Sequence, residues 1–540
     1  MASNSKLAGL LAALFLFLTG NSALAEEAGE VQCAAALGDV WGEAGTDASL
    51  YRLDGANLAS VQELAEAVDN RLVGKRTVIV EGGDFSGRDF SGTAFARLCF
   101  SGTKLAGTNW TGVHAPSIGF VGADLEGAVL RDAHMPGVLF RNANLVNVDA
   151  SGADFSDGQF DGGWFESSIS GWRIDGANMR GFRFDCGITL DDGCPVYTGD
   201  EAVSARGTDF SGAMLESYHL YDMDVARARL HGTRIGPGQL PDFAAAEFAG
   251  PLILAGGDTM VSVSADEARE LIADHAIAAK AGNAPSFDCA KAASPVEKLI
   301  CGEYESELRR LDRQMAWLYA RQPVIDSNPA SGKLPPQPHR EAQRTWLRER
   351  NACMADPDEY AARQCVVDSY NGRIGELLAP LDDMTGLAEG EAALFVDDVL
   401  PLTDAMRGSA LFARIAPVLA ADSYVHVVLI ARANGGYDIE GEAVGANAHT
   451  CGLGASGAHR DGKTGWYIVP HDESASFARI FRLIGDEMDI IDNGHPDYEE
   501  EPAAVDFVSC GMRASFPVMR RIMVDPAIAA RYRVDPEWRP

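Results

Sequence analysis

Large apolar residues recur every five positions through much of the N-terminal half of the chain. One run covers residues 85–165, and a second covers residues 210–235, after the register slips near Ile169. The residue two positions earlier is mostly small or β-branched, as at Ala123 and Ala128. A period of five matches neither the 3.6 of a helix nor the 2 of a strand. The pattern instead predicts a chain that turns a corner every five residues and closes a square in about twenty.

Such a chain stacks its coils into a solenoid. Each corner sends one large and one small side chain inward, so successive coils bury continuous ladders at a spacing of about 4.8 Å. Arg88, Tyr218 and Met223 occupy the position that is otherwise small, and we expect the coils there to be widened or distorted. Residues 186–194 interrupt the repeat, and we expect them to form a loop.

The repeat resembles the pentapeptide-repeat family, whose consensus is A-(D/N)-L-x-x. The segments that carry the resemblance include GADLEGAVLRDAH, RNANLVNVDASGADF and GTDFSGAMLES. The family folds as a right-handed quadrilateral β-helix, and the resemblance covers about residues 82–185 and 205–236. It therefore implies a β-helix over residues 82–236, which we expect to follow an N-terminal cap over residues 26–81. Such a solenoid is a surface for binding and supplies no chemistry of its own.

The first 25 residues are typical of a secretory signal peptide. A single cation, Lys6, precedes the apolar run at residues 7–18, and an Ala-x-Ala pattern ends at Ala25. The apolar core of about 12 residues is shorter than the ~20 that a spanning helix needs. We therefore predict cleavage after Ala25, no integral membrane segment after that cleavage, and a periplasmic or secreted mature protein.

Export to an oxidising compartment permits disulfides, and the ten cysteines are even in number and clustered by segment. None forms the C-x2-C spacing of a metal site, so we predict that all ten are structural. Cys33 could link the cap to Cys99, Cys186 and Cys194 would close the interrupting loop, and Cys451 would pair with Cys510. The remaining four are Cys289, Cys301, Cys353 and Cys365.

These four cysteines frame a segment at residues 285–380 that follows a linker and helix over residues 237–284. The spacing of Leu308, Leu311, Met315 and Leu318 predicts a helix. Further helices are expected over about residues 340–352 and 358–379. Four cysteines allow three connectivities. Of these, an antiparallel helical hairpin favours Cys301 with Cys353, which leaves Cys289 for Cys365.

The same segment resembles the N-terminal domain of lysozyme inhibitor LprI. The resemblance rests on the four cysteines, the V-E-x-x-I-C start, Leu-Asp at 311–312, the Q-R-x-W-L-x-x-R-x-x-C run and the closing Tyr370. It implies an exported helical domain and, for some relatives, lysozyme binding. A proline-rich insertion at residues 323–338 lengthens one inter-helix loop beyond the family pattern.

Within this segment, Arg344, Trp346, Arg348 and Arg350 are candidates for binding a partner. A cluster of arginine and tryptophan has the composition of an interface hot spot. In the alternative interpretation, Trp346 fills the helical core and the arginines pair with acidic residues at positions 303, 305, 307 and 312.

The remaining residues, 390–540, predict a small, mainly β domain. Short β-rich runs lie at residues 424–430, 437–441, 465–470 and 478–484, after an expected helix over about residues 403–419. The stretch from Gly457 to Thr464 satisfies a phosphate-loop pattern, but a strand follows it where a helix would be needed. We therefore predict no cofactor and no metal site, and we find no catalytic motif that would indicate an enzyme.

The balance of charges narrows the choice of partner. With 45 Lys and Arg against 78 Asp and Glu, the formal net charge is −33, which disfavours nucleic acids and favours basic partners. Two functions remain open. The first is an envelope protein that binds, or inhibits, a cationic lysozyme through the LprI-like segment. The second is a scaffold whose β-helix docks another protein.

Overall fold

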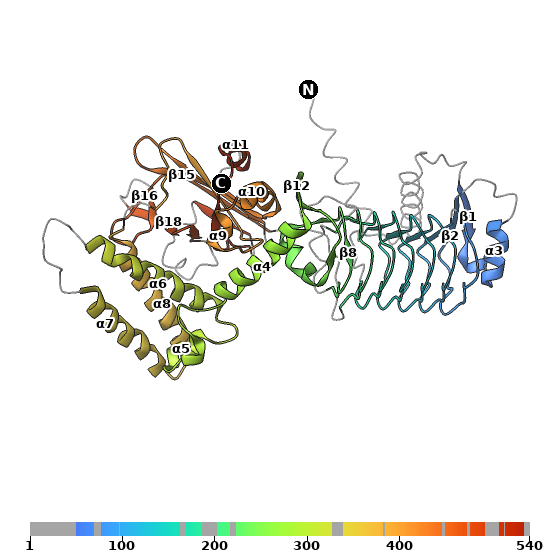
Figure 1. The fold of residues 1–540 in the computed structure, drawn as a ribbon, viewed down its shortest axis with the longest axis horizontal. Coiled ribbons are helices and arrows are strands. Elements are labelled where there is room, and N and C mark those ends of the chain that lie inside the picture. The colour runs from blue at the N-terminus through green and yellow to red at the C-terminus, as the bar shows by residue number, and fades with distance from the viewer. Residues whose placement is uncertain are drawn as a thin grey trace, which may run out of the picture. The chain divides into compact units, whose positions relative to one another are not determined.

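The computed structural model describes residues 50–69, 77–96, 98–161, 169–185, 202–215, 223–326, 338–381, 384–444, 449–471, 476–491, 507–511 and 514–533 (Figure 1). The predicted signal peptide and its Ala25 cleavage site lie outside these residues. The chain divides into two compact units. Unit 1 comprises Met1–Ile253 with Ser262–Ala265, and unit 2 comprises Leu254–Val261 with Asp266–Pro540.

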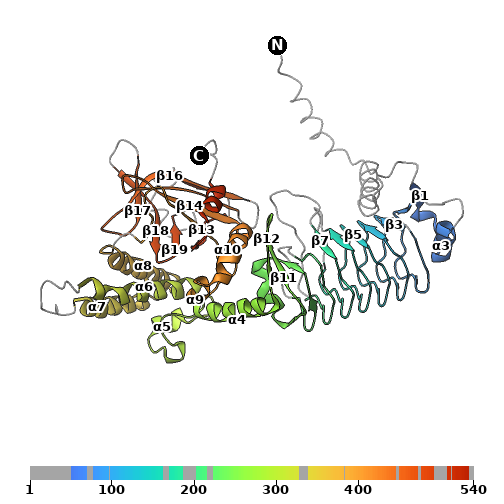
Figure 2. The same ribbon diagram turned by 45° about the horizontal axis from the view of Figure 1, so that its top comes forward.

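Unit 1 is a β-solenoid built from the five-residue repeat. Seven parallel strands follow one another along one face in the order of the sequence (Figure 2). Leu139 pairs with Gly119, and Gly119 pairs with Cys99, so one full coil takes the predicted twenty residues. The strands are β1 Leu50–Asp54, β2 Thr77–Glu81, β3 Leu98–Ser101, β4 Gly119–Val121, β5 Leu139–Arg141, β6 Gln159–Asp161 and β7 Arg183–Asp185.

The interior of the solenoid is filled by stacked aromatic rings. Phe120 stacks on Phe100 and Phe140 with ring centroids 5.8 Å and 5.5 Å away, and all three rings are buried. The predicted small positions, Ala123 and Ala128 among them, are also buried. Corners of the coil adopt positive φ, as at Gly152, where a Cβ would also lie 2.5 Å from Asp132 Oδ1. The glycines that recur after the large residues therefore supply the positive φ that the corners require.

Within the described repeat that follows β2, two coils are longer than twenty residues. The pairing of Asp149 with Arg173 spans 24 residues and that of Arg173 with Ser204 spans 31, whereas Ser204 pairs with Asp224 at the regular interval. The slip in the sequence register near Ile169 is therefore an insertion that the solenoid carries without losing its ladders. The cysteines of the 186–194 loop, Cys186 and Cys194, lie outside the described residues.

The prediction of distorted coils at the bulky inward positions is wrong where the structure tests it. The guanidinium of Arg88 lies over the Phe85 ring at 4.8 Å and donates to the Leu58 carbonyl at 3.4 Å. Because Leu58 belongs to the cap, the side chain of this early coil reaches toward the cap and does not cross the interior. Met223 is buried, but the residues just before it, Tyr218 among them, lie outside the described residues, so distortion there stays a prediction.

Short elements close the two ends of the solenoid. At the N-terminal end, the predicted cap contains η2 Gly55–Asn57 and α3 Val61–Asp69 beside β1. At the other end, Leu240 and Phe243 of a 3₁₀ helix are buried. The later elements are β8 Arg229–Leu230, β9 Arg234–Ile235, η3 Pro237–Ala245, β10 Glu247–Phe248, β11 Leu252–Gly256 and β12 Thr259–Val263.

From α4 onward, the first part of unit 2 is helical. The expected helices over residues 340–352 and 358–379 form, as does one helix within residues 237–284, and a short additional helix precedes the first long one of the segment at residues 285–380. The elements are α4 Ala265–Gly282, η4 Cys289–Lys291, α5 Pro295–Ile300, α6 Ser306–Asp326, α7 Pro338–Ala352, η5 Cys353–Ala355 and α8 Glu359–Leu378. Leu308, Leu311, Met315 and Leu318 are buried, as the spacing predicts.

The rest of unit 2 is an antiparallel sheet that closes on itself, because β16 pairs with both β15 and β17. Its interior holds apolar side chains such as Val427, Ile439 and Phe481. The strands are β13 Ala392–Val396, β14 Val425–Ala431, β15 Tyr437–Val444, β16 Thr450–Arg460, β17 Tyr467–His471, β18 Ser476–Ile484, β19 Glu487–Ile490, β20 Val508–Cys510 and β21 Met519–Ile522. The helices are α9 Asp404–Arg407, α10 Ala410–Asp422, α11 Pro526–Ala529 and η8 Ala530–Tyr532.

The helices and the sheet of unit 2 share one core, although the sequence analysis assigns residues 285–380 and 390–540 to separate domains. Ile484 of β18 belongs to the apolar cluster of the helices. Gln314 Nε2 donates to Glu487 Oε2 at 2.8 Å, and Arg482 donates to Asn371 Oδ1 at 3.1 Å. Among the described helices, none combines the length and the apolarity needed to cross a membrane.

Candidate interaction surface

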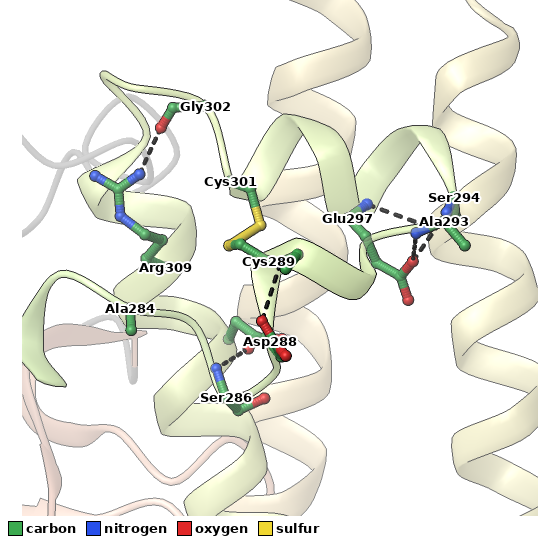
Figure 3. The surroundings of a disulfide bond; sticks show 12 residues. Ala284, Ser286, Asp288, Cys289, Ala293, Ser294, Glu297, Cys301, Gly302 and Arg309 are labelled. Carbon is green, nitrogen blue, oxygen red and sulfur yellow. Dashed lines mark hydrogen bonds between the residues drawn. A yellow bond between two sulfur atoms is a disulfide. The ribbon is translucent and has the colours of Figure 1, made fainter.

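Two disulfides fix one end of the helical segment at residues 285–380, and their pairing differs from the predicted one. Cys289 bonds to Cys301 (Figure 3), and Cys353 bonds to Cys365. The prediction of Cys301 with Cys353 and Cys289 with Cys365 is therefore wrong. That prediction placed Cys301 at the start of the long helix, whereas Cys301 directly follows the short helix α5 and a turn separates it from α6.

Local hydrogen bonds explain why Cys289 and Cys301 meet. Ser294 caps α5, and the carboxylate of Glu297 accepts from the backbone N–H groups of Ala293 and Ser294 at 2.8 Å (Figure 3). This capping box turns the chain sharply between the two cysteines. The glutamate of the V-E-x-x-I-C motif thus shapes the turn that its cysteine closes. Those same bonds hold the pKa of the Glu297 carboxyl below its ordinary value.

The other cysteines fall into three groups. Cys451 of β16 bonds to Cys510 of β20, as predicted, because the two strands pair directly at these residues. Cys99 is disulfide-bonded, but its predicted partner Cys33 lies outside the described residues. Cys186 and Cys194 lie outside them as well.

Several residues of the sequence motifs in this helical segment meet in a buried polar network. The Tyr370 hydroxyl donates to Asp312 Oδ1 at 2.8 Å, and Arg350 Nη1 donates to the Tyr370 oxygen at 2.7 Å. Asp312 also accepts from the Ser286 backbone N–H at 2.7 Å. Burial, reinforced by the Asp312 charge, raises the pKa of Tyr370. The phenol therefore stays neutral and links three helices.

The four predicted partner-binding residues separate into two pairs. Trp346 is buried, its indole N–H donates to the Ser369 carbonyl at 3.0 Å, and its ring meets Tyr370 edge-on. Arg350 is buried in the Tyr370 network. Arg344 and Arg348 are exposed. The residues of the proposed hot spot therefore do not form one surface.

A residue that the sequence analysis did not single out, Arg363 of α8, pairs with two of the four acidic residues assigned to those arginines. Its guanidinium pairs with Glu305 at 3.0 Å and with Glu307 at 2.9 Å. These bonds join the start of α6 to the first turns of α8. The contact joins residues more than fifty positions apart, so no local pattern predicts it. The sequence shows only that Arg363 is a cation on a helix that also carries a cysteine of the second disulfide.

The outer faces of the solenoid carry polar side chains that pair from one coil to the next. The residue before each large inward residue points outward, and matching residues of adjacent coils pair. Asn109 donates to Asp89, Asn144 to Asp124 and Asn178 to Asp154, at 2.9–3.0 Å. The Asp/Asn position of the repeat consensus is thus explained by bonds between coils, a role that the sequence analysis did not assign.

One outward carboxylate, Asp149, binds two arginines. Arg131 Nε donates to it at 2.7 Å and Arg173 Nη1 at 3.3 Å, while Ser151 donates from its hydroxyl at 2.7 Å. Partial burial alone raises the pKa of the Asp149 carboxyl, but the Arg131 and Ser151 hydrogen bonds outweigh it. The pKa therefore lies below its ordinary value of 3.8.

The stretch that satisfies the phosphate-loop pattern is a turn between two strands. It spans the end of β16 and the hairpin to β17, where Asp461 accepts from the Lys463 backbone N–H and the Thr464 hydroxyl. No helix follows to present its N-terminus to a phosphate. Over the described ranges, no group of three His, Cys, Asp or Glu side chains could hold a metal ion.

Comparison with known proteins supports the solenoid. The family model "Pentapeptide repeats" matches residues 120–157 in eight copies. QnrB1, a plasmid-mediated fluoroquinolone resistance protein, is 18% identical over 29% of this chain and 81% of its own, with a TM-score of 0.19. A pentapeptide repeat protein of the Arabidopsis thaliana thylakoid lumen is 29% identical over 20% and 70%, with a TM-score of 0.15.

A third solved structure is HetL, a pentapeptide repeat protein involved in heterocyst differentiation regulation from the cyanobacterium Nostoc sp. strain PCC 7120. It is 17% identical over 35% of this chain and 91% of its own, with a TM-score of 0.12. No curated protein matches the chain. TM-scores this low carry no argument about function.

Proposed function

We propose that this protein, which carries a pentapeptide-repeat β-solenoid, is an exported binding protein of the cell envelope that binds and inhibits a cationic lysozyme through its LprI-like segment. The observation that carries the proposal is the arrangement of the motif residues. Asp312, Trp346, Arg350 and Tyr370 meet in one buried network beside two disulfides. This gives these four residues of the resemblance, and its cysteines, a structural reason.

The charge of the chain supports the choice of partner. A formal net charge of −33 attracts a strongly basic protein, speeds the encounter and makes its rate sensitive to salt. The two disulfides hold one end of the helical segment in a fixed conformation, so less conformational entropy is lost when a partner binds. Pentapeptide-repeat proteins are generally structural or binding proteins, which agrees with a non-enzymatic role.

The test is lysozyme activity on a cell-wall substrate with purified, oxidised residues 26–540, at low salt and at 0.15 M salt. The whole mature chain is used because the helices share a core with the sheet. We expect inhibition that persists at 0.15 M salt. No effect at a large molar excess would overturn the proposal for that enzyme.

A second candidate function rests on the solenoid alone. Its outer faces carry regular ladders of paired polar side chains, which could dock a protein of the envelope while unit 2 is accessory. Cross-linking from Glu126, an exposed residue of the solenoid, separates the two functions. A defined envelope protein linked there, without lysozyme inhibition, would favour the scaffold.

A further inference from the structure

Two tyrosines of unit 2 are exposed to an unusual degree. Tyr304, in the turn between α5 and α6, has 88% of its surface exposed, and Tyr360, in the first turn of α8, has 75%. Tyrosine normally buries much of its ring. Side chains this exposed, next to each other on a rigid surface, are typical of sites that contact another protein.

The structure brings both tyrosines to the same end of the helical segment. Arg363 of α8 pairs with Glu305, which follows Tyr304 directly, and with Glu307. Tyr360 precedes Arg363 by three residues, so the two side chains share one face of α8. The Arg363 clasp therefore sets the turn that carries Tyr304 against the helix turn that carries Tyr360.

Both turns are held rigid. The Cys289–Cys301 disulfide ends one residue before Gly302, and Arg309 donates to the Gly302 and Glu303 carbonyls (Figure 3). The Cys353–Cys365 disulfide encloses the second turn, and Asp358 accepts from the backbone N–H groups of Tyr360 and Ala361 at 2.9 Å and 3.0 Å. A tyrosine on fixed backbone loses little entropy on binding.

The side chains around the two rings are acidic. Glu303, Asp356, Asp358 and Glu359 are exposed, and in the described part of the chain none of their carboxylates forms an ion pair. The neighbouring cations Arg309 and Arg363 are engaged with the turns themselves, and Lys291 pairs with Asp288 at 3.1 Å. Lys298 of α5 is an exposed cation of the same segment.

We propose that this tyrosine tip, defined as Glu303, Tyr304, Asp356, Asp358, Glu359 and Tyr360, is the surface that contacts the basic partner. Tyrosine rings stack on guanidinium groups, and carboxylates bind arginine and lysine, so the tip fits a surface rich in both. The same charge repels nucleic acid and anionic lipid. The inference rests on the proposed function, because it takes a cationic lysozyme as the partner.

The test compares the affinity of residues 26–540 and of four variants for a cationic lysozyme at 0.15 M salt. The tip variants are Tyr304→Ala with Tyr360→Ala, and Glu303→Lys with Glu359→Lys. The matched controls lie on unit 1: Tyr51→Ala, at a tyrosine with 38% of its surface exposed, and Glu126→Lys, at an exposed glutamate. Thermal unfolding of each variant establishes that it is folded.

We expect the double variant Tyr304→Ala with Tyr360→Ala to bind about thirtyfold more weakly, as for the loss of a hot spot. The charge reversal should slow association and flatten its dependence on salt, and both controls should bind as the unchanged chain does. If the unchanged chain binds and the folded tip variants bind equally well, the proposed contact at the tyrosine tip is overturned while the proposed function stands. If the unchanged chain does not bind, both are overturned.

Discussion

In the solenoid, Phe120 stacks on rings that lie one coil before and one coil after it in the sequence. In unit 2, Gln314 of α6 bonds to Glu487 of β19, 173 residues further along. In the solenoid, therefore, each inward residue contacts the equivalent residue of the next coil. The interior of unit 2 joins helices to a closed sheet through pairs that no period relates. The difference shows that regular sequence spacing determines contacts only where the fold itself is periodic.

The largest expected effect comes from breaking an aromatic ladder. Phe120→Ala removes a buried ring between two others, and should cost unit 1 about 3–5 kcal/mol of unfolding free energy. Hydrogen exchange during denaturant unfolding, followed separately in the two units, measures it. Glu126→Ala, at an exposed position of the same coil, is the control. Equal loss of protection in unit 2 would contradict the division of the chain into two units.

The second effect concerns the disulfide of the closed sheet. Cys451→Ser with Cys510→Ser opens a loop of 59 residues, and should lower the stability of unit 2 by about 2–4 kcal/mol. The same exchange experiment reports it, with the protection of unit 1 as internal control. Unchanged stability of unit 2 would show that the sheet does not depend on this bond.

A smaller effect tests the buried network that joins the helices. Tyr370→Phe deletes the hydroxyl between Asp312 and Arg350, and should cost unit 2 about 1–3 kcal/mol because the Asp312 carboxylate loses a buried donor. Chemical denaturation measures the loss. Tyr360→Phe, at an exposed ring, should leave stability unchanged. Similar values for the two variants would argue against a structural role for the network.

The smallest effect lies on the outside of the solenoid. Asp149→Asn weakens the bonds from Arg131 and Arg173 and should cost about 1 kcal/mol at neutral pH. The Asp149 pKa is lowered on folding, so this stability is present above the ordinary value of 3.8 and is lost as the pH falls below it. The difference between the original chain and the variant should therefore shrink below about pH 4. Asp132→Asn, at an exposed position nearby, is the control for loss of a carboxylate on the same face.

Much of the solenoid could be predicted because its contacts are periodic. The inward positions of Phe120 and Ala123 follow from the five-residue spacing alone. The predicted distortion at Arg88 is wrong because this residue lies near the end of the solenoid, where its side chain reaches the Leu58 carbonyl. A repeat pattern describes the interior of a stack and says nothing about its boundary.

In unit 2, the long helices and Cys451–Cys510 agree with the sequence-based expectations, whereas the short helix α5 and the first two disulfide pairings do not. Leu308 and Leu311 follow helical spacing, so the helix they mark could be recognised locally. The pairing of Cys289 with Cys301 depends on a capping box at Ser294 and Glu297 that inserts a short helix. The Arg363 clasp depends on two helix ends that meet only in the folded unit.

The sequence by itself determined the solenoid, the helices of unit 2 and the clustering of the cysteines, because each is a local or periodic pattern of side chains. Only the tertiary structure decided which cysteines join, that Trp346 and Arg350 lie in the core while Arg344 and Arg348 are exposed, and that Tyr304 and Tyr360 share one exposed tip. Those outcomes depend on how helices and strands far apart in the chain pack against one another, which no spacing within a segment encodes.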